Sequence, residues 1–368
     1  MHTRSNFRLL VVRLGAMGDI LHALPAVTAL RQAHPQWIID WAVEPHWSAL
    51  LTAHDRFSPP SAQDSTPPQS LAQPLIDHLH MAATKAWRKA PFSGRTLHEI
   101  RMLRSALRAG EYDAVLDLQG AVRSAILARW TGCRRRIGEL EPRERPARWF
   151  FTEHVATRGR HVIEQDLELA SAVAGDALQP VAPWLPVDPA AEAWADEILP
   201  PTAIHPAVLI SPGAGWGAKR WPVERYAAVA RGLIERGCRI LVNAGPREEP
   251  LAEVIDRATG GAAVALSGTL AQLIALTRRI ALAVAGDTGP LHLACALGRP
   301  VVGIYGPTDP GRNGPFGTRF EVLRSPASRR DHSRRAEPEP GLLTIQPEDV
   351  MRAALALLYP EASLKDRR

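Results

Sequence analysis

The chain is poor in cysteine, with three among its 368 residues. Cys133, Cys238 and Cys295 are far apart and form no C-x-x-C pair. The spacing therefore indicates neither a disulfide framework nor the usual ligand pattern of a structural zinc site. We expect a protein of a reducing compartment.

Long apolar runs are also missing. None approaches the roughly 18 residues that a membrane-spanning helix requires. Arg13 interrupts the apolar start of the chain, so no signal peptide is evident. Any association with a membrane is therefore expected to be peripheral.

The composition is that of a globular protein, with 46% hydrophobic and 22% charged residues. A chain of 368 residues is long for one core, so two domains are expected. The net charge of +6 favours anionic partners such as phosphorylated sugars, an anionic membrane face or nucleic acid. Charge alone does not choose among them.

The hydrophobic pattern predicts an α/β protein. The apolar residues 7–14 predict a buried strand, residues 20–33 a helix and residues 38–43 a second strand. A β-α-β start of this kind is typical of a Rossmann-like half. Residues 58–73 and 324–341 are rich in proline and polar residues and are interpreted as mobile surface segments.

A proline-rich stretch at residues 180–206 suggests the connection between two domains. We expect an N-terminal domain at residues 1–184 and a C-terminal domain at residues 185–345. Residues 346–368 carry a final amphipathic helix, which we expect to pack back on the first domain.

Residues 280–310 predict strand, tight turn, helix and strand. The turn holds Asp287, Thr288 and Gly289, and His292 follows in the first turn of the helix. A strand that ends at a helix N-terminus offers backbone N–H groups and the positive end of the helix dipole to an anion. The plainer alternative is a turn that needs glycine only for its geometry.

A second glycine-rich run occupies residues 211–222. Gly213, Gly215 and Ala218 match G-x-G-x-x-A, so a dinucleotide site has to be considered. That fingerprint requires a helix that opens within the glycine run, whereas Pro222 indicates a later start.

Four motifs resemble glycosyltransferase family 9, the lipopolysaccharide heptosyltransferases. Gly-Asp-Thr-Gly-Pro-Leu-His-Leu-Ala at 286–294 and Tyr-Gly-Pro-Thr-Asp-Pro at 305–310 resemble its donor-site signature. Arg-Leu-Gly-Ala-Met-Gly-Asp-Ile-Leu-His at 13–22 resembles its N-terminal motif, and Gly-Ala-Lys-Arg-Trp-Pro at 217–222 its phosphate-binding segment. The resemblance covers nearly the whole chain. It implies the GT-B fold, with two Rossmann-like domains whose parallel sheets face a central cleft.

The resemblance also assigns roles to single residues. It implies that Asp19 is the general base, although an Asp at this position could merely cap the helix. Lys219 would bind the leaving diphosphate as a point charge, together with Asp287, Thr288, Gly289 and His292. Glu248 would contact the nucleotide ribose, although an acidic residue there could equally serve the helix dipole.

The acceptor side is predicted from a basic stretch. Lys85, Arg88 and Lys89 are interleaved with aromatic residues, which suits an anionic amphipathic partner or simply a solvated loop. Trp-Arg-Lys-Ala-Pro-Phe-Ser at 87–93 resembles the acceptor loop of the heptosyltransferase I branch. Gln119, at the end of another predicted strand, is a weaker candidate. Arg13, where the family often has Lys, completes the acceptor set.

The implied reaction moves L-glycero-D-manno-heptose from ADP-heptose to a Kdo (3-deoxy-octulosonate) residue of lipid A–Kdo, with inversion. No cofactor and no metal are expected, because the chain lacks Asp-x-Asp and because His78 and His80 are interpreted as surface residues. The enzyme is expected in the cytoplasm, peripherally on the inner membrane, with no nucleic acid and no obligate protein partner.

Three alternatives stay open at this point. One is heptosyltransferase II or another family 9 transferase with a different acceptor or donor. A second is an NAD-dependent oxidoreductase that uses residues 213–218. A third is a non-catalytic protein that binds a nucleotide sugar.

Overall fold

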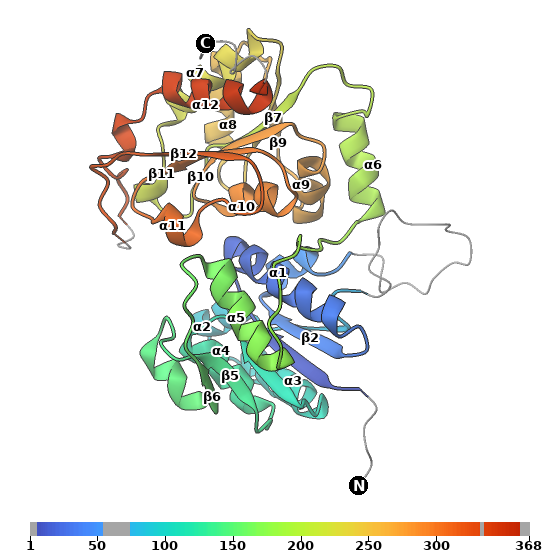
Figure 1. Ribbon diagram of the computed structural model, residues 1–368. Helices are drawn as coiled ribbons and strands as arrows, with labels where there is room; N and C mark the ends of the chain where they lie inside the picture. The colour runs from blue at the N-terminus through green and yellow to red at the C-terminus, as the bar shows by residue number, and fades with distance from the viewer. Residues whose placement is uncertain (1–5, 54–73, 332–334, 361–368) are drawn as a thin grey trace. The chain divides into compact units, whose positions relative to one another are not determined.

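The computed structural model describes residues 6–53, 74–331 and 335–360. The chain divides into two compact units, Met1–Pro186 and Val187–Arg368 (Figure 1). Each has its own parallel β-sheet. The expected surface loop at residues 58–73 lies outside the described residues. Within the part of the chain that the structure describes, no helix is long and apolar enough to cross a membrane.

The first unit is built on a six-stranded parallel sheet. Its order is β3 (His78–Met81), β2 (Ile38–Val43), β1 (Arg8–Val12), β4 (Ala114–Asp117), β5 (Arg136–Glu139), β6 (Glu153–Val155). The central strands are near-continuous apolar runs because both faces of a parallel sheet are covered.

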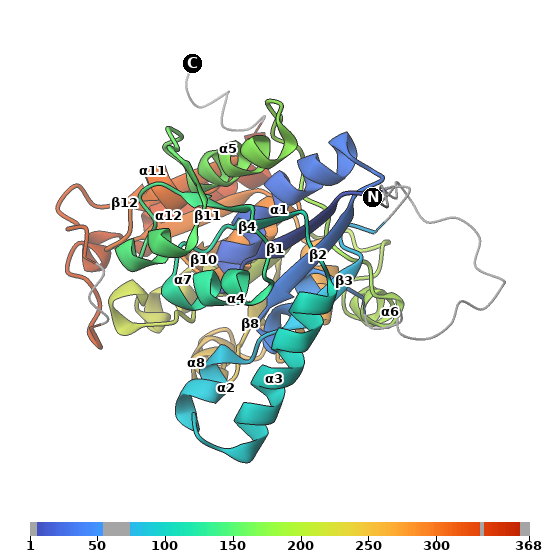
Figure 2. The same ribbon diagram turned by 90° about the horizontal axis from the view of Figure 1, so that it is seen from below.

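Helices cover both faces of this sheet. Figure 2 shows α1 and α5 on one face and α3 and α4 on the other. The helices of the unit are α1 (Met17–Ala33), α2 (Thr84–Lys89), α3 (Gly94–Ala109), α4 (Val122–Trp130) and α5 (Val162–Ala174), with the 3₁₀ turns η1 (Pro45–Leu50) and η3 (Arg145–Phe150). Strand β3 and helix α2 replace the loop that the basic stretch suggested.

The second unit repeats the plan with the order β12 (Phe320–Arg324), β11 (Val301–Tyr305), β10 (Leu282–Gly286), β7 (Ala207–Ser211), β8 (Arg239–Asn243), β9 (Val264–Leu266). All neighbouring strands are parallel. Its helices are α6 (Pro189–Ile198), α7 (Val223–Ile234), α8 (Glu249–Ala258), α9 (Leu270–Thr277), α10 (Gly289–Ala296), α11 (Pro310–Asn313) and α12 (Pro347–Leu358), with the 3₁₀ turns η4 (Gly217–Lys219) and η5 (Leu342–Thr344).

Helix α12 packs within the second unit, and its expected contact with the first domain stays a prediction. Its residues Val350, Ala354 and Leu357 belong to the core of the second unit, with the buried side chains of α7 and of the sheet. The Nε1–H of Trp221 donates to the carbonyl of Ile345 at 3.2 Å, just before the helix. The amphipathic face of α12 is therefore buried within its own unit.

The segment after β12 was expected to be mobile, but its described part is docked. The N–H of Ala218 donates to the carbonyl of Arg335 at 3.1 Å, and the N–H of Glu339 donates to the carbonyl of Ala218 at 3.2 Å. A Cβ on Gly217 would lie 1.5 Å from the carbonyl oxygen of Ala336. These contacts hold residues 335–339 against the glycine-rich loop.

Candidate active site

Asp19 lies in the first turn of α1, directly after the loop that leaves β1. Its Oδ2 accepts a hydrogen bond from the N–H of Ala16 at 2.9 Å. Its side chain is nevertheless 36% exposed. The carboxylate is thus held in place while part of it stays open to a ligand at the carboxyl edge of the sheet, where α/β proteins bind their substrates.

Arg13 lies beneath Asp19. Its guanidinium is buried, donates from Nε to the backbone carbonyl of Asp19 at 3.0 Å, and places an Nη 3.7 Å from the Asp19 carboxylate. The sequence suggested that Arg13 binds the acceptor. In the structure its contacts hold Asp19, and acceptor binding by Arg13 stays a prediction.

Gln119 is buried as well and holds the loop that precedes Asp19. Its Oε1 accepts from the N–H groups of Leu14 at 3.0 Å and Gly15 at 3.3 Å. Gly15 has a φ of 141°, and a Cβ there would lie 2.7 Å from the Nε1 atom of Trp47. Gln119 thus supports the shape of the loop rather than presenting its carbonyl oxygen to an acceptor.

Asp117 ends strand β4 and supports Gln119 in turn. One carboxylate oxygen accepts from the N–H groups of Gln119 and Gly120, both at 2.8 Å. The side chain is fully enclosed, and this burial raises the pKa of Asp117 to about 6 in spite of the hydrogen bonds that it receives. A carboxyl group so placed acts on the loop from below and does not reach a ligand.

Glu44 is a site residue that sequence reasoning missed. It follows β2, and its N–H donates to the carbonyl of Leu14 at 3.1 Å. Its buried carboxylate accepts from the hydroxyl of Thr84 at 2.5 Å and from the N–H of Lys85 at 3.1 Å. Glu44 therefore ties the start of α2 to the loop before Asp19. The sequence feature that could have identified Glu44 was its position directly after a predicted strand.

The three cations of α2, Lys85, Arg88 and Lys89, are exposed. The contact through Glu44 brings the first of them to the same edge of the sheet as Asp19. The first unit thus combines a partly open carboxylate with exposed cations on α2.

In the second unit, Lys219, Asp287 and His292 form one cluster. The Nζ of Lys219 lies 2.5 Å from Oδ2 of Asp287 and 3.2 Å from its backbone carbonyl. Oδ1 of Asp287 is 3.0 Å from Nε2 of His292. Burial by itself raises the pKa of Asp287, but the His292 hydrogen bond and the Lys219 charge outweigh it and hold that pKa well below its usual range.

This cluster is held together by its own contacts. Asp287 and His292 are both buried and face each other. Asp287 fixes the position of Lys219, and the donor contacts expected of Asp287 and His292 stay predictions. The ammonium of Lys219 also lies 5.4 Å from the centre of the Trp216 ring, a cation–π distance.

Helix α10 begins beside this cluster. Thr288 is its N-cap residue, Gly289 opens the helix, and the Thr288 hydroxyl lies 3.3 Å from the carbonyl of Gly286. The first N–H groups of a helix have no acceptor inside the helix. The turn after β10 therefore offers donors and a positive dipole next to Lys219.

Glu248 lies where two strand-end loops meet. Its Oε2 accepts from the N–H of Gly245 at 2.9 Å. A Cβ on Gly213 would lie 2.0 Å from its Oε1, so the glycine allows the carboxylate to approach the glycine-rich loop. Glu248 precedes α8 and points to the same strand edge as Lys219.

The dinucleotide interpretation of Gly213, Gly215 and Ala218 finds no matching geometry. A 3₁₀ turn follows the glycine run, and the next helix, α7, begins only at Val223. The helix therefore does not open within the glycines, as the pyrophosphate-binding turn of that fingerprint requires.

The expectation that His80 is a surface residue is wrong. Its Nε2 lies 2.7 Å from the hydroxyl of Tyr112, which donates to the buried Asp40 at 2.6 Å. His78, in contrast, is mostly exposed. In the described ranges, no group of three or more His, Cys, Asp or Glu side chains is arranged to hold a metal ion.

A family model described as glycosyltransferase family 9 (heptosyltransferase) matches residues 100–342. Lipopolysaccharide heptosyltransferase 1 of Escherichia coli (strain K12) is 31% identical over 323 residues, which are 87% of this chain and 94% of that protein.

Two solved structures show the same fold. The structure of E. coli heptosyltransferase WaaC with ADP has a TM-score of 0.76 at 27% identity, covering 95% of this chain and 100% of that one. The structure of WaaC with ADP-2-deoxy-2-fluoro heptose has a TM-score of 0.72 at 28% identity, covering 94% and 98%. The family model spans more than half of the chain, and the two parallel-sheet units have the architecture of the GT-B fold. The chain therefore belongs to glycosyltransferase family 9.

Proposed function

We propose that this protein transfers L-glycero-D-manno-heptose from ADP-heptose to a Kdo residue of a lipid A precursor, in synthesis of the lipopolysaccharide inner core. The observation that carries the proposal is Asp19, a partly exposed carboxylate held by Arg13 and by the N–H of Ala16. The similarity to lipopolysaccharide heptosyltransferase 1, and to a WaaC structure with an ADP-heptose analogue, supports this donor and this reaction.

Asp19 is the proposed general base. As the acceptor hydroxyl oxygen forms its bond to the anomeric carbon, the carboxylate takes the hydroxyl proton. The bond between the anomeric carbon and the diphosphate oxygen breaks on the opposite face, so the configuration is inverted and ADP leaves with the electron pair. The sugar passes through a transition state with oxocarbenium character.

Lys219 is proposed to receive the departing diphosphate. An ammonium group has three N–H donors, and two of those of Lys219 are directed to Asp287. The third, with the backbone N–H groups at Thr288 and Gly289, would contact phosphate oxygens as negative charge develops on them. We assign the ribose contact to Glu248, which lies at the same strand edge.

The acceptor is proposed to be Kdo-lipid A at the cytoplasmic face of the inner membrane. Lys85, Arg88 and Lys89 are exposed cations on α2, close in the fold to the loop before Asp19. They would bind the carboxylate and phosphate groups of the acceptor and keep the enzyme peripherally at an anionic surface.

The test is release of ADP from ADP-heptose by the purified protein, with and without Kdo-lipid A, together with analysis of the product. We expect acceptor-dependent release and a heptosylated product. Asp19→Asn should lower kcat at least about 100-fold and leave the Kd of the donor within about twofold, because the carboxylate acts on the acceptor hydroxyl.

The donor site is tested with a matched pair of adjacent carboxylates. Glu248→Gln should raise the Kd of ADP-heptose, whereas Glu249→Gln, an exposed neighbour in the first turn of α8, should not.

Donor binding without transfer to Kdo-lipid A would refute the acceptor assignment. Transfer only to an acceptor that already carries one heptose would indicate the heptosyltransferase II reaction. A protein that binds NADH but not ADP-heptose would refute the proposal altogether.

A further inference from the structure

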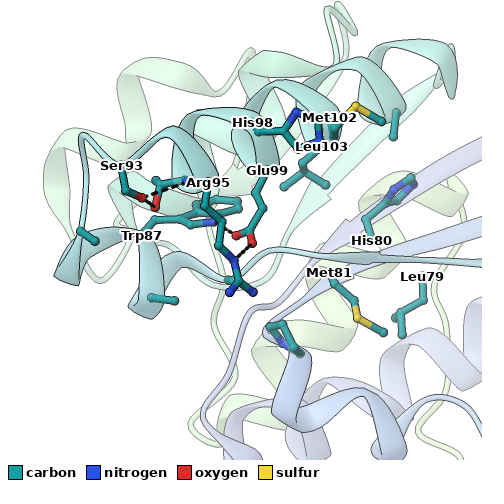
Figure 3. A pocket seen from close by; sticks show the side chains of 16 residues that line it. Leu79, His80, Met81, Trp87, Ser93, Arg95, His98, Glu99, Met102 and Leu103 are labelled. Atoms are coloured by element: carbon teal, nitrogen blue, oxygen red, sulfur yellow. Dashed lines mark hydrogen bonds and ion pairs between the residues drawn. The ribbon is translucent and has the colours of Figure 1, made fainter.

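An apolar groove of about 840 Å³ lies in the first unit, between α3 on one side and β3 with the start of η1 on the other. Figure 3 shows Met102 and Leu103 of α3 and Leu79 and Met81 of β3 on opposite walls, with Trp87 of α2 towards one end. Its volume falls within the range of small-molecule sites, roughly 300–1,000 Å³.

The groove leaves large apolar side chains open. Met81 is 50% exposed and Met102 is 58% exposed, although both line a concave surface. Single exposed apolar residues are ordinary on a protein surface, but a hollow lined by several of them indicates a binding site. Methionine is flexible and adapts to a flexible apolar ligand.

Positive charge is concentrated on the hairpin that forms one wall of the groove. The α2–α3 hairpin, residues 84–109, contains seven Lys and Arg residues, all of them exposed: Lys85, Arg88, Lys89, Arg95, Arg101, Arg104 and Arg108. Its one acidic residue, Glu99, accepts hydrogen bonds from Arg95 and from Nε1 of Trp87, both at 2.8 Å. Arg95 is the one of these cations that lines the groove. An apolar hollow on a cationic hairpin is complementary to an anionic amphiphile.

The groove also adjoins the edge of the sheet that carries Asp19. Pro45, which lines it, directly follows Glu44. The N–H of Glu44 donates to the carbonyl of Leu14, in the loop before Asp19, and its carboxylate holds the first turn of α2. A ligand chain in the groove would therefore leave its head group close to the candidate base.

We propose that the groove binds one acyl chain of the anionic acceptor lipid, while the cations of the hairpin bind its acidic groups. This inference rests on the proposed function, because it names a subsite for the same acceptor. Burial of one methylene group contributes about 0.8 kcal/mol, which corresponds to about a fourfold change in affinity. A chain that is only partly buried would thus contribute one or two orders of magnitude to acceptor binding.

The first experiment compares two acceptors, Kdo-lipid A and its fully deacylated form, on the full-length protein. Met102→Asp should raise KM for the acylated acceptor at least about tenfold and leave kcat and the KM of the deacylated acceptor within about twofold. Leu97→Asp is the matched control, because Leu97 is on the same helix, 44% exposed, and outside the groove lining. It should leave both KM values within about twofold.

The control also separates the groove from a flat membrane contact. Phe92, at the tip of the hairpin, is 90% exposed and does not line the groove. If Phe92→Asp and Leu97→Asp raise KM as much as Met102→Asp does, the hairpin lies on the bilayer and the groove proposal is overturned. Equal KM values of the wild-type protein for the two acceptors would overturn it as well.

A second experiment does not depend on transfer. Calorimetry would measure binding of dodecyl phosphate below its critical micelle concentration. We expect the wild-type protein and Leu97→Asp to bind it alike and Met102→Asp to bind it at least about tenfold more weakly. If the wild-type protein binds dodecyl phosphate but transfers heptose to neither acceptor, the proposed function fails while the chain-binding groove stands. If no dodecyl phosphate binds, the groove proposal fails, whatever the transfer assay shows.

Discussion

Asp117 makes the stability of the first unit depend on pH. Its pKa is about 6 in the folded protein because the side chain is fully buried, against 3.8 for an ordinary aspartate. The folded state thus binds the proton more tightly than the unfolded chain does. The stability that the neutral carboxyl contributes is fully present below about pH 3.8 and is lost as the pH rises through about 6.

The magnitude follows from the two pKa values. A difference of about two pH units corresponds to about 3 kcal/mol in the free energy of unfolding, at 1.36 kcal/mol for each unit. About half of this, roughly 1.4 kcal/mol, is lost between pH 5 and pH 8, because the folded-state group ionises within that range. In Asp117→Asn the side chain does not titrate, so this loss disappears.

The measurement is urea unfolding of the full-length wild-type protein and of Asp117→Asn at pH 5, 6, 7 and 8. The free energy of unfolding of the variant minus that of the wild type should rise by about 1.4 kcal/mol from pH 5 to pH 8. Any constant cost of burying the amide cancels in this comparison. Thermal unfolding should show the same trend, about 3–6 °C in Tm for a unit of this size.

Asp176→Asn serves as the control, because it removes one negative charge from an exposed position in the same unit. Its difference from the wild type should stay constant across the four pH values. If the difference for Asp117→Asn is flat or falls towards pH 8, the carboxyl group is not destabilised by burial. The support that Asp117 is inferred to provide beneath Gln119 would then need another explanation.

Three further predictions concern one residue of the first unit and two of the second. Asp287→Ala leaves the Lys219 ammonium without its buried carboxylate, so urea unfolding should show a free energy of unfolding lower by about 3–5 kcal/mol. Calorimetry should show weaker binding of ADP-heptose. An unchanged free energy of unfolding would contradict the stabilising role of the buried pair. Glu44→Ala removes the acceptor for the first turn of α2 and should raise the KM of Kdo-lipid A about tenfold, a loss of about one hydrogen bond to a charged group, while the donor Kd stays within twofold. Glu44→Gln keeps one acceptor oxygen and should remain close to the wild type, and equal effects of the two variants would argue against this role. Gly217→Ala places a Cβ 1.5 Å from the carbonyl oxygen of Ala336, so it should displace the glycine-rich loop and weaken ADP binding. In the control Gly215→Ala, the added Cβ meets no atom within 4 Å, and ADP binding should be unchanged. Equal ADP affinities of the two variants would show that the contact with residues 335–339 does not shape the donor site.

Periodicity and glycine-bounded turns could be predicted from the chain because they are local. Strand β2 has the bounds that the apolar pattern indicated, and β11 and helix α12 lie within the ranges where a strand and a final helix were expected. The start of the second α/β unit and the turn around Asp287 were also visible. Helix α2 was missed because its six residues, only two of them apolar, are too few to show an apolar period, and strand β3 because its alternating histidines resemble a surface pattern.

The sequence by itself determined the α/β class, the strand-end motifs and the family that they resemble, since each depends on residues close together in the chain. Tertiary structure alone decided what these residues contact. Lys219 meets Asp287 across 68 positions, Glu44 meets Lys85 across 41, and Gln119 meets Leu14 across 105. Strand order brings these pairs together, and no local pattern encodes that order. The burial of α12 within its own unit, the docking of residues 335–339 and the groove beside α3 depend on the same long-range packing.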